Sequence, residues 1–192
     1  MAKVINRCPW GNNDPVMLKY HDEEWGVLVT DDKKLFEFLI LEGAQAGLSW
    51  ELILKRREGY RKAFADFEVK KVANFSDKKI EKLLQDPGII RNKLKMRSAV
   101  HNAKLFIEVQ REFGSFYNYS MQFVGGKPKI NKRQKMSDYP ATTKESDLFS
   151  KDLKEKGFKF VGSTIIYAHM QACGMVNDHL TSCFRYTEIN NS

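Results

Sequence analysis

The chain has 192 residues, which is enough for one domain, or two tightly associated lobes, with a buried core. Lysine and arginine total 32 against 24 acidic residues, and the resulting net charge of +8 favours polyanionic partners, nucleic acid foremost. No apolar run approaches the roughly 20 residues that a transmembrane helix needs, so no membrane association is expected. Abundant lysine without a secretory leader indicates a reducing, cytoplasmic location.

The predicted elements are almost all helices. Asp14-Pro15 is an N-cap followed by a first-turn proline, Ser49 and Ser76 are further caps, and apolar residues recur at helical spacing after each of them. In chain order we expect helices near 14–25, 31–46, 49–60, 76–86, 92–113, 145–156, 163–173 and 177–184. Strand-like alternation is nearly absent, so the sequence predicts an all-α fold in a single domain over residues 1–192.

Two basic runs interrupt or flank these helices. KRREGYRK covers residues 55–62, and KPKINKRQK covers 127–135 within a Gly/Pro/Lys-rich segment at 125–142 that we expect to be an exposed loop. The last eight residues are predicted to be a frayed tail. The basic runs add modest support for a nucleic-acid partner.

Two cysteine–histidine pairs lie at opposite ends of the chain, Cys8 with His21 and His179 with Cys183. They use two of the three cysteines and two of the four histidines. A structural zinc ion takes four such ligands in a tetrahedron, and on a helix His179 and Cys183 would share one face. These residues therefore predict one divided metal site. A disulfide between the two cysteines is the alternative, although a reducing compartment disfavours it; Cys173 is predicted to be a small buried residue.

Glu42 is the carboxylate with the clearest functional pattern. It continues an apolar stripe through Leu35, Phe38 and Leu39 at positions i, i+3, i+4 and i+7, whereas Glu37 is expected to point away. An inward carboxylate is costly unless something satisfies it. A buried ion pair or a cap on backbone amides would do so, and so would a cationic ligand in a pocket.

Aromatic residues and small residues surround this carboxylate in the sequence. The segment GAQAGLSW follows Glu42, and its glycines allow the backbone to approach another molecule closely. Trp50 ends that segment, while Trp10, Tyr20 and Trp25 lie near the first pair of metal ligands. Aromatic rings beside a carboxylate can bind a flat, positively charged ring, although a tryptophan in a small domain is more often part of the core.

The segment LLQDPGIIRNKLKM predicts a helix, a tight turn and a second helix. The Pro87-Gly88 turn would place backbone amides beside Arg91, Lys93 and Lys95. Such a helix–hairpin–helix can hold a phosphate without reading sequence. A plain helix–helix turn is the other interpretation of this pattern.

Four segments resemble the 3-methyladenine DNA glycosylase I family of bacterial alkylation-repair enzymes: DPVMLKYHDEEWGV, LEGAQAGLSWELILKRRE, QDPGIIRNKLK and KGFKFVGSTIIYAHMQACGMVNDH. The resemblance extends from about Cys8 to Cys183. It implies an all-α helix–hairpin–helix fold of two lobes in which one zinc ion joins the two ends of the chain. It also implies a monomer that acts on alkylated double-stranded DNA and releases free 3-methyladenine.

The resemblance assigns roles to individual residues. Those that would bind the base, or take part in catalysis, are Glu42, Tyr20, Trp50 and Trp10, with Glu42 and Tyr20 as the catalytic pair. The zinc ligands would be Cys8, His21, His179 and Cys183. The residues that would contact DNA are Gly47 and Leu48, which form the wedge, and Pro87, Gly88, Ile89 and Ile90 in the hairpin. From the charge pattern after the turn, Arg91 and Lys93 are also expected to contact DNA.

The chain departs from the family pattern at a few positions. Met17 stands where a second pocket tyrosine is common, Leu28 replaces a proline, and Ala44 replaces a glutamine. The resemblance further implies a monofunctional enzyme, since the region around Glu108 lacks the aspartate that the wider superfamily uses.

Two other functions fit parts of the sequence. A non-catalytic, zinc-stabilised nucleic-acid-binding module would explain the charge, the hairpin and the metal ligands, but not the inward Glu42. A metal-dependent phosphohydrolase is suggested by the His21-Asp22 and Asp178-His179 pairs. Such an enzyme needs an open coordination position, and four protein ligands would leave none.

Overall fold

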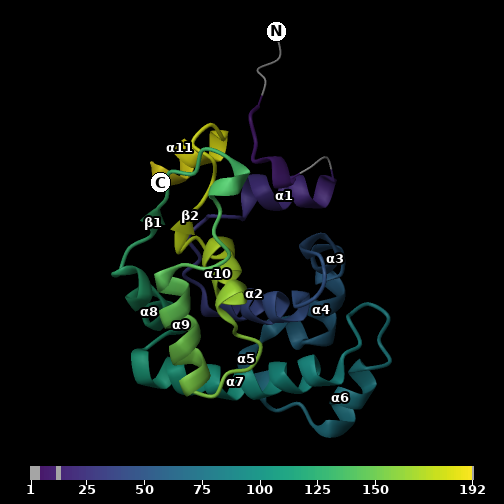
Figure 1. Cartoon of the computed structure of the whole chain (residues 1–192). Coiled ribbons are helices and arrows are strands. Elements are labelled where there is room, and N and C mark those ends of the chain that lie inside the picture. Colours follow the sequence, from purple (N-terminus) through teal and green to yellow (C-terminus); the bar gives the residue numbers. More distant parts are fainter. Residues whose placement is uncertain (1–4, 12–13, 192) are drawn as a thin grey trace.

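The computed structural model describes residues 5–11 and 14–191, and these are mostly helical, as predicted (Figure 1). No helix among them is both long and apolar enough to cross a membrane. The helices are α1 (Pro15–Glu23), α2 (Asp32–Gln45), α3 (Trp50–Lys55), α4 (Arg57–Ala63), α5 (Val69–Ala73), α6 (Asp77–Leu83), α7 (Lys93–Phe113), α8 (Phe116–Met121), α9 (Lys144–Glu155), α10 (Ser163–Ala172) and α11 (Phe184–Asn190), and the strands are β1 (Lys129–Ile130) and β2 (Val176–Asn177).

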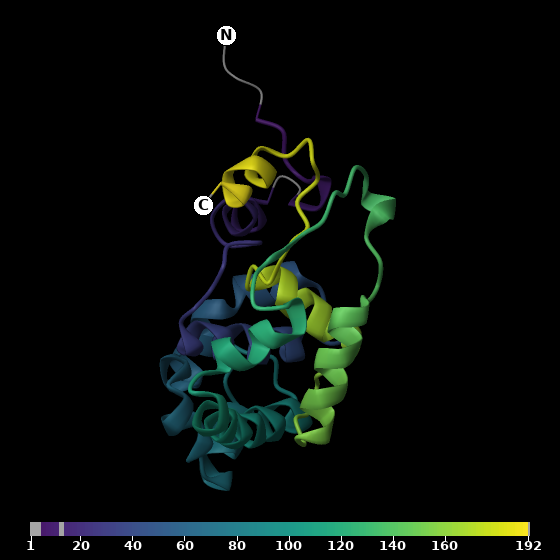
Figure 2. The same cartoon turned by 90° about the vertical axis from the view of Figure 1, so that its left-hand side faces the viewer.

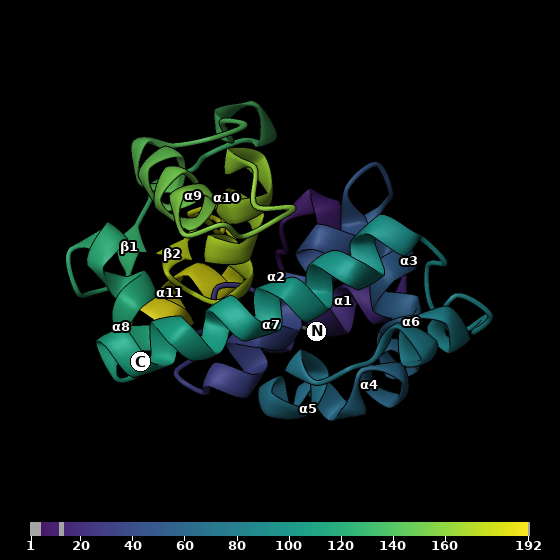
Figure 3. The ribbon, with the colours of Figure 1, turned by 90° about the horizontal axis from the view of Figure 1, so that it is seen from below.

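The long helix α7 runs along one side of the molecule, with α4, α5 and α6 near one half and α8 and α9 near the other (Figure 3). Asn92 caps its first turn through a side-chain bond to the backbone N–H of Lys95. Aromatic rings tie this helix to its neighbours: Phe106 packs edge-on against Phe36 of α2 at 5.2 Å and stacks on Phe116 of α8 at 4.2 Å.

Helix α2 lies at the centre of the fold, because it contacts α3, α7, α8 and α10. Every residue from Leu35 to Ala44 is buried. A helix that is enclosed on all sides must be apolar around most of its circumference, and its two buried glutamates therefore need separate explanations. This central helix carries Glu42 into the interior.

The two ends of the described chain meet on one side of the molecule (Figure 1). The Phe184 N–H donates to Asn6 O at 3.0 Å, and the Asn6 amide donates to Ser182 O at 2.8 Å. Segment 125–142 extends from the helices at the base to this region (Figure 2), where β1 pairs in parallel with β2. The predicted loop is therefore anchored by a two-residue strand that the sequence pattern did not indicate.

The C-terminal prediction was wrong in two respects. Residues 177–184 do not form a helix: β2 ends at Asn177, whose side chain accepts the His179 N–H at 3.1 Å, and such a local bond competes with helix formation. The predicted frayed tail instead contains α11, which begins after the Cys183 N-cap. The last residue of that tail, Ser192, lies outside the described residues.

Two other helix boundaries also differ. The predicted helix 49–60 is divided at Arg56 into α3 and α4, and α6 ends at Leu83 rather than at residue 86. After this division, Gly59 of α4 packs closely against the Pro87-Gly88 turn. A Cβ on Gly59 would lie only 2.3 Å from Gly88 O. Arg56 secures the same contact by donating to Pro87 O at 2.5 Å.

Candidate functional site

The four predicted metal ligands come together in one buried cluster. Their ligand atoms lie within 4.8 Å of one another. Cys183 Sγ is 3.5 Å from both His21 Nε2 and His179 Nδ1, and Cys8 Sγ is 3.6 Å from His179 Nδ1. A tetrahedral ion with Zn–S near 2.3 Å and Zn–N near 2.0–2.1 Å would separate sulfur from nitrogen by about 3.5 Å. The cluster therefore has the spacing and ligand set of a closed metal site.

The outer nitrogens of both histidines are held by oxygen atoms. His21 Nδ1 lies 2.7 Å from the Asp22 carboxylate, which also accepts hydrogen bonds from the Arg7 guanidinium. His179 Nε2 lies 2.9 Å from Trp25 O. Such partners fix the ring orientation and direct the other nitrogen of each ring, His21 Nε2 and His179 Nδ1, toward the two cysteine sulfurs. All three cysteines are free, so the alternative disulfide between Cys8 and Cys183 is not formed.

A cavity of about 440 Å³ lies beside this cluster. It is bounded by η1 (Pro9–Gly11), α1, α2, α3, α10 and segment 125–142. Four of its lining residues, those predicted to bind a base, are Trp10, Tyr20, Glu42 and Trp50. The fold thus brings these four residues to one cavity from four different helices: η1, α1, α2 and α3.

Glu42 is 3% exposed and lines this cavity. In the described part of the chain its carboxylate has no hydrogen bond or ion pair, and burial alone raises the pKa of Glu42 to about 8. Neither a buried ion pair nor an amide cap accounts for it. A carboxyl group in this state gains most from a ligand that brings hydrogen-bond donors or positive charge.

The prediction for Glu37 was wrong, because this residue is only 5% exposed. Its carboxylate accepts from Arg57 at 2.6 Å and from Arg61 at 3.0 Å, and Arg57 bonds Glu24 as well. The arginines hold the pKa of Glu37 below its ordinary value despite burial. The two buried glutamates of α2 therefore differ in kind, one structural and fully paired, the other unpaired and facing a cavity.

The aromatic residues of the cavity pack around Tyr20. Its ring centre lies 5.5 Å from that of Trp50 and 6.3 Å from that of Trp10. Burial and the nearby Glu42 carboxylate raise the pKa of Tyr20 well above its ordinary value, so its hydroxyl stays protonated. The indole N–H groups of Trp10 and Trp50 are buried without an acceptor within the described residues. The cavity therefore combines aromatic surface with one carboxyl group.

Trp10 also connects the cavity to the metal cluster. Its ring lies 5.2 Å from the His21 ring and 4.7 Å from the Trp25 ring, and Trp25 packs edge-on against His179 at 4.6 Å. Stabilising the cluster would therefore hold one wall of the cavity in place.

The opposite wall of the cavity was not predicted from the sequence. This wall is formed by segment 125–142 and by α10. Segment 125–142 contributes Met136, Tyr139, Pro140 and Ala141, and α10 contributes four residues. The α10 residues are Thr164, Tyr167, Ala168 and Gln171, whose i, i+3, i+4, i+7 spacing was the available indication of a shared face.

Asp178 holds this second wall together. Its fully buried carboxylate accepts from Asn131 at 2.8 Å, Arg133 at 3.1 Å and Gln171 at 2.9 Å, and also from the Tyr167 hydroxyl. It thereby joins segment 125–142 to α10. Asp178, which suggested a phosphohydrolase motif in the sequence, therefore has a structural role in which its carboxylate oxygens already accept hydrogen bonds.

Gly47 and Leu48 form an exposed turn between α2 and α3. Gly47 has φ +79°, and a Cβ built on it would meet nothing within 4 Å. The Leu48 side chain is 38% exposed. An exposed apolar side chain on a turn next to the cavity can enter a base stack.

The turn before α7 differs from the prediction in one detail. We expected exposed backbone amides, but the Gly88 N–H donates to Asp86 Oδ1 at 2.7 Å and the Ile90 N–H donates to the Tyr60 hydroxyl at 3.3 Å. The Ile89 side chain is 1% exposed. Pro87 is exposed at the tip, and Arg91 and Lys93 are exposed beside it.

Comparisons with known proteins agree with this geometry. The sequence profile described as methyladenine glycosylase matches residues 10–186. DNA-3-methyladenine glycosylase 1 of Escherichia coli (strain K12) is 46% identical over 182 residues, covering 95% of this chain and 97% of that protein. The DNA-3-methyladenine glycosylase of Haemophilus influenzae is 42% identical over 180 residues, covering 94% and 97%.

A solved structure shows the same similarity in three dimensions. The structure of 3-methyladenine DNA glycosylase I from Staphylococcus aureus, described for its recognition of 3-methyladenine, has a TM-score of 0.90 at 38% identity. The alignment covers 95% of this chain and 97% of that one. From the extent of these matches, the chain belongs to the methyladenine glycosylase family.

Proposed function

We propose that this protein removes 3-methyladenine from alkylated double-stranded DNA by hydrolysing the N-glycosidic bond, which initiates base excision repair. The observation that carries the proposal is the unpaired, buried Glu42 in an aromatic cavity, in a chain of the methyladenine glycosylase family. A non-catalytic binding module has no need for an uncompensated carboxyl group in its interior.

The reaction begins with extrusion of the base, because the glycosidic bond of a stacked nucleotide is out of reach. Unstacking costs a few kcal/mol, and damage to the base lowers that cost. Leu48, exposed on its turn, fills the space that the nucleotide leaves in the duplex.

Methylation at N3 gives adenine a positive charge, so the base departs as a neutral molecule. Glu42 accepts hydrogen bonds from the extruded base, and the positive charge of that base favours the ionised carboxylate over the protonated form. Trp50, Tyr20 and Trp10 supply aromatic faces, which attract a cationic ring more strongly than a neutral one. The cavity thus discriminates the alkylated base by its charge as well as by its shape.

Catalysis requires no covalent bond to the protein in this proposal. No lysine is among the described residues that line the cavity, so no amine lies on its walls to form a Schiff base. The enzyme is therefore monofunctional, with water as the final acceptor of the sugar.

The segment from α6 to α7 holds the DNA backbone as a helix–hairpin–helix. Pro87, Gly88, Ile89 and Ile90 shape the turn. Arg91 and Lys93, exposed at its base, supply positive charge for phosphates, which positions the duplex without reading its sequence.

The cluster of Cys8, His21, His179 and Cys183 holds one zinc ion per chain, with a structural role. The spacing of the four ligand atoms supports this, as do the oxygen partners of both histidines. Four protein ligands complete the coordination shell, and zinc in such a site contributes folding energy rather than chemistry.

The test is base release from methylated duplex DNA. We expect the purified protein to liberate free 3-methyladenine, measured by chromatography of the ethanol-soluble fraction. Binding of methylated DNA without any release would support the nucleic-acid-binding module instead.

Leu48→Ala tests the wedge. Since the side chain is 38% exposed, its truncation should change the melting temperature little. We expect a decrease of roughly tenfold in the single-turnover rate on duplex DNA, because unstacking is no longer compensated. Affinity for free 3-methyladenine, measured by calorimetry, serves as the control and should be unchanged; an unaltered rate would contradict the role of Leu48.

A further inference from the structure

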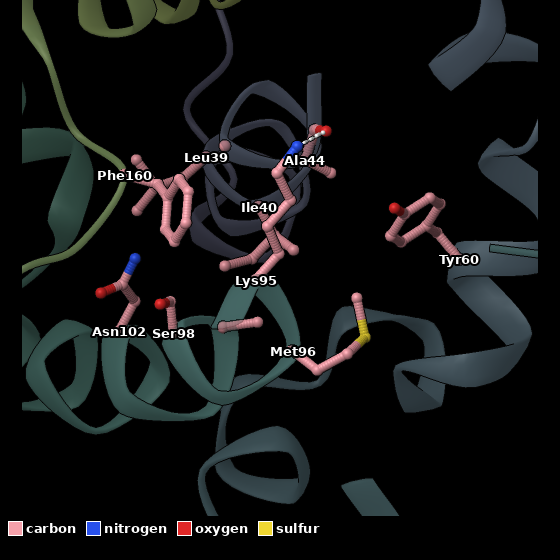
Figure 4. Close-up of a pocket in the computed structure, with 11 residues that line it drawn as sticks. Leu39, Ile40, Ala44, Tyr60, Lys95, Met96, Ser98, Asn102 and Phe160 are labelled. Carbon is pink, nitrogen blue, oxygen red and sulfur yellow. Dashed lines mark hydrogen bonds between the residues drawn. The ribbon is translucent and has the colours of Figure 1, made fainter. Parts of the chain in front are cut away.

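Lys95 joins the turn before α7 to the end of α2. It lies in the first turn of α7, where its backbone N–H donates to the Asn92 side chain at 3.1 Å. Its Nζ donates to Ala44 O at 2.8 Å and to Ala46 O at 2.7 Å. Figure 4 shows the side chain reaching Ala44 from α7. One side chain thus spans two elements that are about fifty residues apart in the sequence.

The contact has a clear physical basis at a helix end. The last carbonyls of a helix lack intrahelical donors and carry partial negative charge. Ala44 and Ala46 lie at the C-terminal end of α2, which ends at Gln45, and the Lys95 ammonium supplies both with a charged donor.

The surroundings direct this ammonium inward. Lys95 lines a small crevice with Leu39, Ile40, Met96 and Phe160 (Figure 4). The accompanying burial lowers the pKa of Lys95. Lys93, two residues earlier, is exposed, so the two lysines have different environments despite their proximity.

One of the two carbonyls that Lys95 bonds, Ala46 O, lies directly before the exposed Gly47–Leu48 turn. Ala46 immediately precedes Gly47, around which a Cβ would find open space. Across the turn, the Leu48 N–H donates to Gln45 O at 2.6 Å. Gly47 and Leu48 are exposed and make few packing contacts. The position of this turn therefore depends on how the residues just before it are held.

We propose that Lys95 is a positioning residue for base extrusion. It holds the Gly47–Leu48 turn at a fixed place relative to the hairpin, so that Leu48 enters the duplex at the site that the damaged nucleotide leaves. It contacts neither the base nor a phosphate. This inference rests on the proposed glycosylase function and adds a residue that couples DNA backbone binding to the wedge.

Lys95→Met tests this coupling. Methionine keeps most of the apolar stem but removes the donor to both carbonyls. We expect the single-turnover rate on methylated duplex DNA to fall roughly tenfold at saturating protein. Affinity for free 3-methyladenine should stay within about twofold, and so should the salt dependence of DNA affinity, since no phosphate contact is lost. Lys95→Arg, which retains donors, should recover part of the rate.

Two control variants on the same helix show whether Lys95 positions the turn or binds a phosphate. Lys93→Met should reduce the slope of log affinity against log salt by about one, as expected for a lost phosphate contact. Lys104→Met, on an exposed position of the same helix, should leave every measured quantity unchanged.

Three results would overturn the proposal for Lys95. A salt slope reduced by about one in Lys95→Met would make the residue a phosphate ligand. A parallel loss of free-base affinity, or a rate that fell only in proportion to the folded fraction, would make it a general stabiliser of the fold. Absence of base release by the wild-type protein would instead reject the glycosylase function, and the variants distinguish these failures.

Discussion

Replacement of Glu42 by glutamine is expected to reduce the release of 3-methyladenine by about 100-fold or more. The change keeps the size of the side chain and removes its capacity for negative charge, which is the charge that attracts the cationic base to this buried position. Loss of one preorganised electrostatic partner at an active site has an effect of this size. The measurement is the single-turnover rate of base release from methylated duplex DNA.

Glu108→Gln is the matched control. Glu108 is an exposed carboxylate on α7 and is not among the residues that line the cavity. Its replacement should leave the rate unchanged. Full activity in Glu42→Gln would reject the role given to Glu42, and a rate lost in both variants would indicate that carboxylates act through the overall charge.

The same substitution should alter how stability depends on pH. Burial raises the pKa of Glu42 from 4.5 to about 8, so between these pH values the folded protein binds a proton that the unfolded chain has lost. This contribution to stability is complete below pH 4.5 and is lost as pH rises towards 8, by up to about 1.4 kcal/mol per pH unit.

Glutamine has no such titration. The stability of Glu42→Gln relative to wild type should therefore increase as pH rises from 5 to 8, measured by urea denaturation. His169, whose pKa burial lowers to about 4, is present in both proteins and cancels in the comparison. A constant difference across this range would show that Glu42 is not protonated in the free protein.

Removal of the proposed zinc ion is expected to lower the melting temperature by roughly 20 °C or more. Binding of structural zinc contributes on the order of 10 kcal/mol in small peptides, and each kcal/mol shifts the midpoint of a domain of this size by about 2–4 °C. The effect should appear on treatment with a strong chelator, and calorimetry is the measurement.

Cys183→Ser tests the same site genetically. Mass spectrometry of the metal content should find about one zinc per wild-type chain and much less in this variant. Cys173→Ala is the control, since Cys173 is buried next to His169, outside the cluster; it should retain the metal. An unchanged melting temperature after chelation would count against a structural metal.

Loss of the metal should affect base recognition less directly than stability. Trp10 contacts both His21 of the cluster and Tyr20 of the cavity. Weakening of the cluster would therefore loosen one wall of the cavity while Glu42 remains on α2. A chelated protein that is still folded should show a reduced affinity for the free base.

Several features of the fold followed from local patterns in the sequence. Capping residues determined where many helices begin: Asp14, Ser49, Ser76, Asn92 and Thr143 all act as N-caps through their side chains, because each satisfies a backbone donor that a helix start leaves free. The helical period likewise placed Glu42 on the inner face of α2. Both signals act within a few residues, so they can be recognised without knowledge of the fold.

Other features depended on contacts between distant segments. Glu37 fits an outward position by periodicity, but Arg57 of α4 reaches it and makes its burial favourable. His179 and Cys183 would share a helix face by spacing alone. The Asn177 side chain instead accepts the His179 N–H, and β1 pairs with β2 directly before these two residues.

Local patterns in the sequence were enough to select the candidate site residues: the inward carboxylate, the aromatic residues near it, and the two cysteine–histidine pairs that form the buried cluster. The second wall of the cavity, the ion pairs of Glu37, and the hydrogen bonds of Lys95 to the end of α2 became visible in the folded structure alone. The reason is physical. Helix caps and periodicity are local, whereas burial of a charge and closure of a cavity depend on which distant groups approach within a few ångströms.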